Sequence, residues 1–303
     1  MSIRFAVTLD PLHIGAGGYR LGRVDNTIVR DAGSGLPKVP GSSLAGVARS
    51  YLVQILDGEE AEKARACAAS ADNDRGNCGK CLACRLFGYA ASGKQKKSHI
   101  GLLRFYDGDI IAFPVSTVAG PVWVTSPSAL AQVLAPADVP VAREDTVLVD
   151  GALPSGMKKI NVGWLYLDAE PAGDSLTALR AALGNDAAKR FSRLALAPDW
   201  LFAELVNSNL EVRTSVSIDP LTGAAEEGKL FTYEAIPAAT LLAFDVDIDR
   251  ARCAYACDAD GKNPVDADEA LRLLDGALEL CGVLGMGGMC TRGFGRVRFL
   301  EGA

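Results

Sequence analysis

The sequence lacks the features that would place it in or across a membrane. No apolar run among its 303 residues is long enough to span a bilayer. The first residues also lack the basic segment and apolar core of a signal peptide. Internal repeats and low-complexity segments are absent, which argues against a repeat architecture. These absences predict a globular protein of the cytoplasm that makes no membrane contact.

The sequence also has fewer basic than acidic residues. Lysine and arginine total 31 against 37 aspartates and glutamates, and the formal net charge is −6. Such a chain is a poor nonspecific binder of nucleic acids, because the phosphate backbone repels acidic surfaces. RNA binding would need a local basic strip, and one cluster offers it: Lys94, Lys96 and Lys97 with Arg85 and Arg104. A solvated loop explains the same cluster equally well.

Hydrophobic residues make up 49% of the chain, enough for one large domain or two closely joined ones. Apolar periodicity predicts helices over 44–56, 59–69, 127–134, 174–184, 186–208 (broken at Pro198) and 265–283. It predicts strands over 3–10, near 100–107, within 110–126, and over 211–217, 229–235, 240–247 and 296–300. Regular β-α-β repeats are absent, so we expect an α+β fold, with helices on one face of a mostly antiparallel sheet. A ferredoxin-like core with long insertions is its natural form.

Two local signals refine this expectation. Ser42 or Ser43 precedes the first helix and can cap its N-terminus with a hydroxyl. The segment 219–223 (Asp-Pro-Leu-Thr-Gly) is a turn signal between two predicted strands. The second signal predicts a protruding β-hairpin.

The eight cysteines are not expected to form disulfides in a cytoplasmic chain. Cys78, Cys81 and Cys84 are spaced so that three thiolates fall within one tight turn, which suits tetrahedral zinc. Cys67 is the first choice for a fourth ligand, and His99 is the second. A site closed by four protein ligands would be structural and would contribute folding free energy. Reduced thiols without a metal, or an iron–sulfur cluster, are the weaker alternatives.

Two glycine-rich segments lie at opposite ends of the chain. The first is 15–18 (Gly-Ala-Gly-Gly), and the second, 287–297, contains Arg292. Glycine backbone beside a helix end or a strand start lets main-chain N–H groups approach phosphates closely. A plain tight turn is the alternative for each segment, and the cation within the second one favours phosphate binding.

Several blocks of sequence together resemble one family. They are 15–18 (Gly-Ala-Gly-Gly), 24–31 (Val-Asp-Asn-Thr-Ile-Val-Arg-Asp), 35–44 (Gly-Leu-Pro-Lys-Val-Pro-Gly-Ser-Ser-Leu), 85–88 (Arg-Leu-Phe-Gly) and 287–295. This set resembles the RAMP superfamily, and within it the backbone subunits of type III CRISPR effector complexes of the Csm or Cmr kind. The blocks do not distinguish between those two kinds.

The resemblance implies a fold and a function. The fold would be a modified ferredoxin-like or RRM-type palm in a single domain, 1–303. An insertion over 58–99 would carry the zinc knuckle, and a thumb hairpin would span about 205–240. Copies of the subunit would form a filament on CRISPR RNA, together with other effector subunits. The assembly would bind single-stranded target RNA and cleave it at regular intervals, with Mg²⁺ or a similar divalent metal.

The resemblance also assigns roles to residues. Asp25 matches the aspartate that cleaves target RNA, either as general base or as metal ligand. The residues matched to RNA binding are Gly17, Gly18, Ser42, Ser43, Arg49, Gly287, Gly288 and Arg292. The family usually has lysine where this chain has Ala45, so that phosphate contact would have to come from Arg49 or from the lysine cluster at 94–97. A thumb would expose apolar residues near its tip, and Leu221, Leu230 and Phe231 are available.

Other interpretations remain beside this one. A noncatalytic subunit would polymerise on guide RNA without cutting, and Asp25 would then be an ordinary turn residue. A nuclease that processes CRISPR RNA belongs to the same superfamily, but it usually relies on histidine or other loop residues. His13 is an acid–base candidate, although a lone histidine near a strand end is more often structural.

Overall fold

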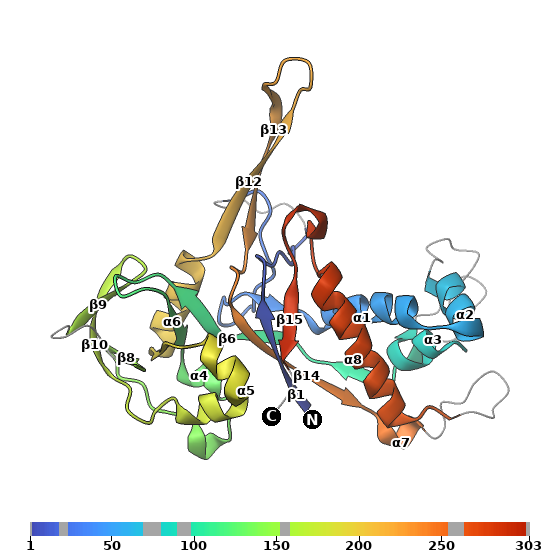
Figure 1. Cartoon of the computed structure of the whole chain (residues 1–303), viewed down its shortest axis with the longest axis horizontal. Helices are drawn as coiled ribbons and strands as arrows, with labels where there is room; N and C mark the ends of the chain where they lie inside the picture. Colours follow the sequence, from blue (N-terminus) through green and yellow to red (C-terminus); the bar gives the residue numbers. More distant parts are fainter. Residues whose placement is uncertain are drawn as a thin grey trace. The chain divides into compact units, whose positions relative to one another are not determined.

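The chain divides into two units, each assembled from segments that are distant in the sequence (Figure 1). The computed structural model describes residues 2–17, 24–68, 80–89, 98–151, 158–253 and 264–300. The first unit comprises 1–2, 40–107 and 245–285, and the second comprises 3–39, 108–244 and 286–303. Within the described residues, we find no helix with the length and apolarity needed to cross a membrane.

The second unit is built on a mixed sheet. Its strands run in the spatial order β15 (Val297–Leu300), β1 (Ser2–Thr8), β14 (Leu241–Ile248), β6 (Gly108–Val115), β7 (Val122–Thr125), β11 (Leu194–Leu196), β8 (Thr146–Val149), β10 (Leu165–Pro171) and β9 (Lys159–Val162). The short β2 (Lys38–Val39) pairs with β6. Two pairs, β7–β11 and β8–β10, are parallel, whereas β1–β15 and β6–β7 are antiparallel.

One face of this sheet carries the apolar core of the unit. The fully buried Phe191 packs edge-to-face on Trp123 at 5.6 Å, and the Trp123 indole donates to the Ala239 carbonyl at 2.8 Å. Two helices accompany the core, α4 (Pro127–Leu130) and α5 (Thr177–Arg190). A third, α6 (Asp199–Ser208), buries Leu201, Phe202, Leu205 and Val206 at helical spacing.

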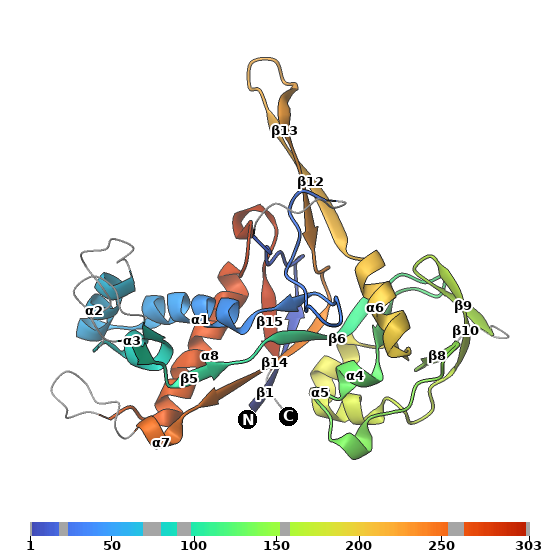
Figure 2. The ribbon, with the colours of Figure 1, turned by 180° about the vertical axis from the view of Figure 1, so that it is seen from behind.

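The predicted hairpin is present in the second unit. It consists of β12 (Glu211–Ile218) and β13 (Ala225–Ala235), and Figures 1 and 2 show it extending well beyond the sheet of its unit. The Asp219 carboxylate holds the turn by accepting from the Leu221 amide and the Thr222 hydroxyl, each at 2.9 Å. Leu221 is 94% exposed at the tip, and Leu230 is 61% exposed nearby. The hairpin therefore exposes apolar side chains at its tip, as predicted.

The first unit is mainly helical. Its helices are α1 (Gly41–Ile55), α2 (Gly58–Ala68), α3 (Leu82–Phe87), α7 (Arg250–Cys253) and α8 (Ala267–Leu284). Its strands are β3 (Gly88–Tyr89), β4 (His99–Ile100) and β5 (Leu103–Phe105), and β5 pairs with the C-terminal half of β14. Helix α1 packs on α8, and the Tyr51 hydroxyl donates to the Gly285 carbonyl at 2.5 Å.

The N-terminus of α1 differs from the prediction. Pro40 is the N-cap residue and makes no side-chain cap, so neither Ser42 nor Ser43 serves as the predicted cap. The Asp107 carboxylate, distant in sequence, accepts a 2.7 Å hydrogen bond from the Gly41 amide and supplies the capping charge instead.

The segment 186–208 also differs from the helix predicted there. The helix α5 ends at Arg190, and β11 (Leu194–Leu196) follows before α6 begins. Every residue of β11 is fully buried. A short apolar run looks the same in a buried strand as in a buried helix, so periodicity could not separate them. The predicted helix at 127–134 is likewise shorter, ending at Leu130, and strands β8, β9 and β10 were not predicted.

The contact between α1 and β5 gives a test of the fold. A Cβ added at Gly41 would lie 2.6 Å from the Phe105 carbonyl oxygen, whereas one added at Gly46, in the same helix, meets nothing within 4 Å. We expect Gly41→Ala to destabilise the protein by about 1–3 kcal/mol through overpacking. Gly46→Ala should stabilise the helix by up to about 1 kcal/mol through lower backbone entropy. Thermal denaturation of both variants checks this, and equal effects of the two would contradict the packing described.

Candidate functional site

The first loop of the chain lies along the root of the hairpin. Asn26 forms a parallel bridge with Tyr233 of β13. The Asn26 amide donates to the Thr232 carbonyl, and its carbonyl accepts from the Glu234 amide, both at 3.0 Å. The loop thereby adds a short piece of backbone to the hairpin edge, which fixes the position of the preceding residue.

That preceding residue is Asp25, the predicted catalytic aspartate. Its side chain is exposed, and its Oδ2 atom accepts from the Thr232 amide at 2.8 Å and from the Thr232 hydroxyl at 2.7 Å. The Asp25 amide donates back to the same hydroxyl at 2.9 Å. Hydrogen bonds from the Thr232 backbone and then its side chain lower the pKa of Asp25 below its ordinary value. The structure thus presents an ionised carboxylate at the surface, held in one orientation.

An ion pair between the buried Glu234 and the half-buried Arg30 holds the same loop. The Glu234 carboxylate lies 2.7 Å from the Arg30 guanidinium and also accepts from the Ile28 amide at 3.4 Å. The Arg30 guanidinium additionally donates to Asn207 Oδ1 on α6. Sequence reasoning missed this pair, because nothing in the mixed polar and apolar strand 229–235 marks Glu234 as buried.

His13 is buried behind the loop rather than presented to solvent. Its Nδ1 atom lies 2.7 Å from the Glu234 carbonyl oxygen, and its ring meets the Tyr233 ring edge-to-face at 5.7 Å. Only 7% of His13 is exposed. These contacts give His13 a structural task in joining the first loop to the hairpin root.

The terminal glycines pack directly on His13. Gly287 has φ +83°, and a Cβ there would lie 2.5 Å from the His13 carbonyl oxygen. The Gly288 amide donates to that oxygen at 2.8 Å. The Gly288 N–H is therefore already satisfied within the protein, and the need for glycine here follows from close packing. Gly287 is exposed.

Arginines surround the remainder of this loop. Arg292 is exposed in a short 3₁₀ turn (Cys290–Arg292) that ends at Gly293, which has φ +78°. Arg213 of β12 donates to the Gly293 carbonyl at 3.2 Å, and its guanidinium lies 4.7 Å from the centroid of the Phe294 ring. Arg213 was not predicted, and it ties the terminal loop to the hairpin root.

The second unit therefore brings together three of the predicted elements: the first loop with Asp25, the hairpin, and the terminal glycine loop. Gly17 lies in the first loop, exposed and with φ +68°. Gly18 lies outside the described residues. Asp31 is separate from this corner and holds the 31–35 turn through the Gly33 and Ser34 amides, which lower its pKa to about 2.

The remaining predicted RNA-binding residues lie in the first unit. Ser42 is exposed in the first turn of α1 and Ser43 is half-buried. Arg49 donates to the Gly88 carbonyl at 2.9 Å, and its other terminal nitrogen lies 3.9 Å from Cys84 Sγ. These contacts give Arg49 a structural task beside the cysteines. The predicted lysine cluster at 94–97 lies outside the described residues.

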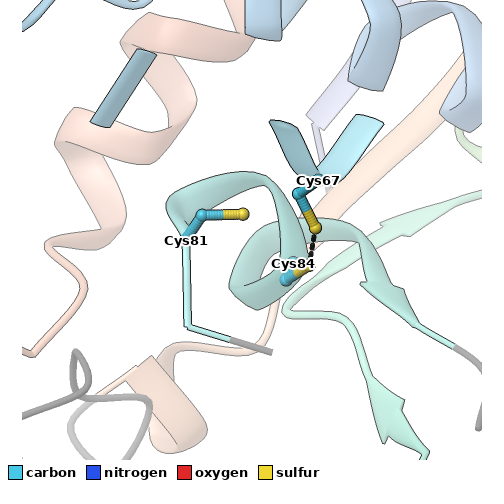
Figure 3. Close-up of side chains that lie close together, drawn as sticks. All are labelled: Cys67, Cys81 and Cys84. Carbon is cyan, nitrogen blue, oxygen red and sulfur yellow. Dashed lines mark hydrogen bonds between the residues drawn. The ribbon is translucent and has the colours of Figure 1, made fainter. Parts of the chain in front are cut away.

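Three of the predicted cysteine ligands come together in the first unit. Figure 3 shows the Cys67 and Cys84 side chains meeting, with that of Cys81 beside them. All three thiols are buried, their sulfurs lie within 4.8 Å of one another, and Cys67 and Cys84 are 3.2 Å apart. Cys78 lies outside the described residues. His99 does not belong to this group of ligand atoms among the described residues; its ring lies 6.0 Å from that of Tyr89.

Comparison with known proteins agrees with the family resemblance seen in the sequence. The sequence matches the RAMP superfamily over residues 5–298. It is 29% identical over 251 residues to the "CRISPR system Cmr endoribonuclease Cmr4" of Pyrococcus furiosus, covering 77% of each chain.

Solved structures share the fold. Oligomeric Cmr4 from Pyrococcus furiosus superposes with a TM-score of 0.62 at 21% identity, covering 99% of this chain and 97% of that one. A chain of the type III-B Cmr-beta complex bound to cognate target RNA also gives 0.62, at 17% identity, covering 98% and 95% of the two chains. At these identities the likeness establishes the fold alone.

The ion pair that holds the loop provides a test. We expect Glu234→Gln to destabilise the protein by about 1–3 kcal/mol, because it removes the charge of a buried carboxylate that pairs with the half-buried Arg30. The control is Asp168→Asn, which removes an exposed pair with Lys159 and should change stability by less than about 0.5 kcal/mol. Chemical denaturation measures both variants, and a Glu234→Gln effect as small as the control would contradict the support role.

Proposed function

This chain belongs to the RAMP superfamily, and from that premise we propose that it is a backbone subunit of a type III CRISPR ribonucleoprotein. It binds CRISPR RNA and cleaves complementary target RNA at regular intervals. The observation that carries the proposal is the exposed, ionised Asp25 carboxylate, held at the root of a protruding hairpin. The likeness to a curated endoribonuclease over 77% of the chain supports it.

The environment of Asp25 favours one of the two roles predicted for it. Hydrogen bonds that lower the pKa of a carboxylate weaken it as a general base at neutral pH. The same bonds keep an anionic oxygen in place, which suits a ligand for Mg²⁺ or a similar divalent cation. Such an ion, when bound, supplies charge neutralisation at the scissile phosphate. We therefore assign Asp25 the role of holding a divalent cation in place, and not that of a general base.

The cleavage step needs no covalent intermediate with the protein. The target's own 2′-hydroxyl gives up its proton to water as its oxygen bonds to the adjacent phosphorus, the bond to the 5′-oxygen breaks, and that leaving oxygen takes up a proton from water. This leaves a cyclic phosphate and a free 5′-hydroxyl. The protein's contribution is to hold the strand splayed and in line for this attack. The hairpin, with Leu221 and Leu230 exposed near its tip, provides the wedge that separates bases on either side of the cut.

Guide RNA is held through its phosphates, so that any guide sequence is accepted. In the second unit the exposed Gly17, Gly287 and Arg292 are the groups we assign to this task, with Gly18 as a further predicted contact. The Gly288 amide is already bound to the His13 carbonyl and is not assigned. In the first unit the assigned groups are Ser42, Ser43 and Arg49. The partners are CRISPR RNA, target RNA, further copies of the chain and other effector subunits, in the cytoplasm.

The finer features of the fold are part of the same proposal. The sheet of the second unit corresponds to a modified ferredoxin-like or RRM-type palm in a single domain, 1–303, and the hairpin region of about 205–240 to its thumb. The 58–99 insertion carries a structural zinc site. The three buried thiols form a soft donor set that fits zinc, with Cys78 as the fourth ligand, and the Arg49 guanidinium beside Cys84 would offset part of the thiolate charge.

The catalytic role of Asp25 is tested in the assembled, guide-loaded complex with Mg²⁺. Asp25→Asn should lower target cleavage by at least about 100-fold, because the amide lacks the anionic oxygen that would hold a divalent cation beside the scissile phosphate. Target binding should be retained. Asp168→Asn, an exposed aspartate elsewhere in the second unit, is the control and should cleave normally. Periodic cleavage that persists in Asp25→Asn would leave the chain a noncatalytic scaffold.

The zinc site is tested by elemental analysis of the purified protein. Cys84→Ser should lose most of the bound zinc, because it removes a thiolate from the centre of the group. Cys253→Ser changes a buried cysteine of the same unit outside the group and should retain zinc. Zinc absent from the unmodified protein, or equal in the two variants, would contradict the site.

A further inference from the structure

The contact that orients Asp25 comes from the hairpin. Thr232 lies on β13, and all three hydrogen bonds between these two residues use its amide or its hydroxyl. We propose that Thr232 is a positioning residue for the Asp25 carboxylate, so that the hairpin root directly sets the geometry of cleavage. The inference rests on the proposed function, because it takes Asp25 as the cleaving residue.

The hydroxyl of Thr232 has two tasks at once. It accepts from the Asp25 amide at 2.9 Å and donates to Asp25 Oδ2 at 2.7 Å. The Thr232 amide also donates to the same oxygen at 2.8 Å, so three hydrogen bonds join Asp25 to Thr232. Only serine or threonine at position 232 can both accept and donate in this way, so the side-chain chemistry here is specific.

Asp25 needs such a partner because it is exposed. A solvated aspartate samples several rotamers, and each alternative places its charge elsewhere. Reacting groups must be held within a fraction of an ångström for efficient cleavage. The Asn26–Tyr233 bridge fixes the backbone at this point, and the Thr232 hydroxyl extends that order to the carboxylate.

The regular pairing of the hairpin root gives the Asp25 carboxylate a fixed position. The register from Glu211↔Ala235 to Val216↔Leu230 is unbroken, and Thr232 lies within it, paired with Thr214. The root is anchored by Arg213 to the terminal loop. The irregularity in the hairpin comes only beyond Val216, toward the tip. A displacement of the root would therefore move the Thr232 donors and the Asp25 carboxylate together.

The test compares three variants in the assembled, guide-loaded complex. Thr232→Val keeps the size and the backbone amide and removes only the hydroxyl. It should lower the single-turnover cleavage rate by about 10- to 100-fold through misplacement of Asp25, with target affinity unchanged. Thr232→Ser restores the hydroxyl and should recover most of the rate. Thr214→Val, the exposed cross-strand partner with no contact to Asp25, should cleave normally.

A second readout does not depend on cleavage. In the free chain, NMR of labelled aspartate carboxyls should show Asp25 titrating below 3.8, the ordinary value. Thr232→Val should raise that pKa, because the ionised form loses a donor. Thr232→Ser should restore the low value.

The outcomes separate this inference from the function on which it rests. If Asp25→Asn abolishes cleavage while Thr232→Val matches the unmodified complex in rate and titration, positioning by Thr232 is wrong and the proposed function stands. If Asp25→Asn cleaves normally, the proposed function itself fails. If Thr232→Val loses target binding to the same extent as cleavage, or Thr232→Ser fails to rescue, the residue is merely structural and the inference is overturned.

Discussion

The pairing of the first loop with β13 is the interaction on which the rest of the site depends. Through the Asn26–Tyr233 bridge, a segment near the N-terminus pairs along the edge of a strand that lies about 200 residues later in the sequence. Asp25 then meets Thr232 on the exposed side, while Arg30 meets Glu234 on the buried side. Neither contact could form if the loop were free, so backbone pairing sets the position of both charges.

His13 connects this pairing to the other end of the chain. Its ring contacts the hairpin root through Tyr233 and the Glu234 carbonyl, and its own carbonyl accepts from the terminal loop at Gly288. The glycine at 287 is required by the space that His13 occupies. A motif that suggests phosphate binding can thus owe part of its composition to packing. The exposed groups of such a motif, here Arg292, are the ones left for a ligand.

Sequence reasoning located the elements better than the contacts between them. Helices α2 and α8 and the hairpin strands follow from periodicity and turn chemistry, because those signals are local. Asp25 was identified through the family resemblance, since an exposed turn aspartate has no signature of its own. Thr232, Glu234 and Arg213 were missed because their roles arise from partners far along the chain. The cap of α1 was assigned to adjacent serines, whereas Asp107 supplies the charge from 66 residues away.

The irregularity between Val216 and Ile218 divides the hairpin into a root and a tip. The root carries the donors that hold Asp25, and a shift of one residue there would turn its side chains to the opposite face. The contacts of the tip beyond the irregularity are local: Asp219 holds the turn, and Lys229 pairs with Glu226. Substitutions and changes of length at the tip therefore leave the carboxylate undisturbed. The hairpin thus separates the surface that meets a partner from the surface that holds the carboxylate.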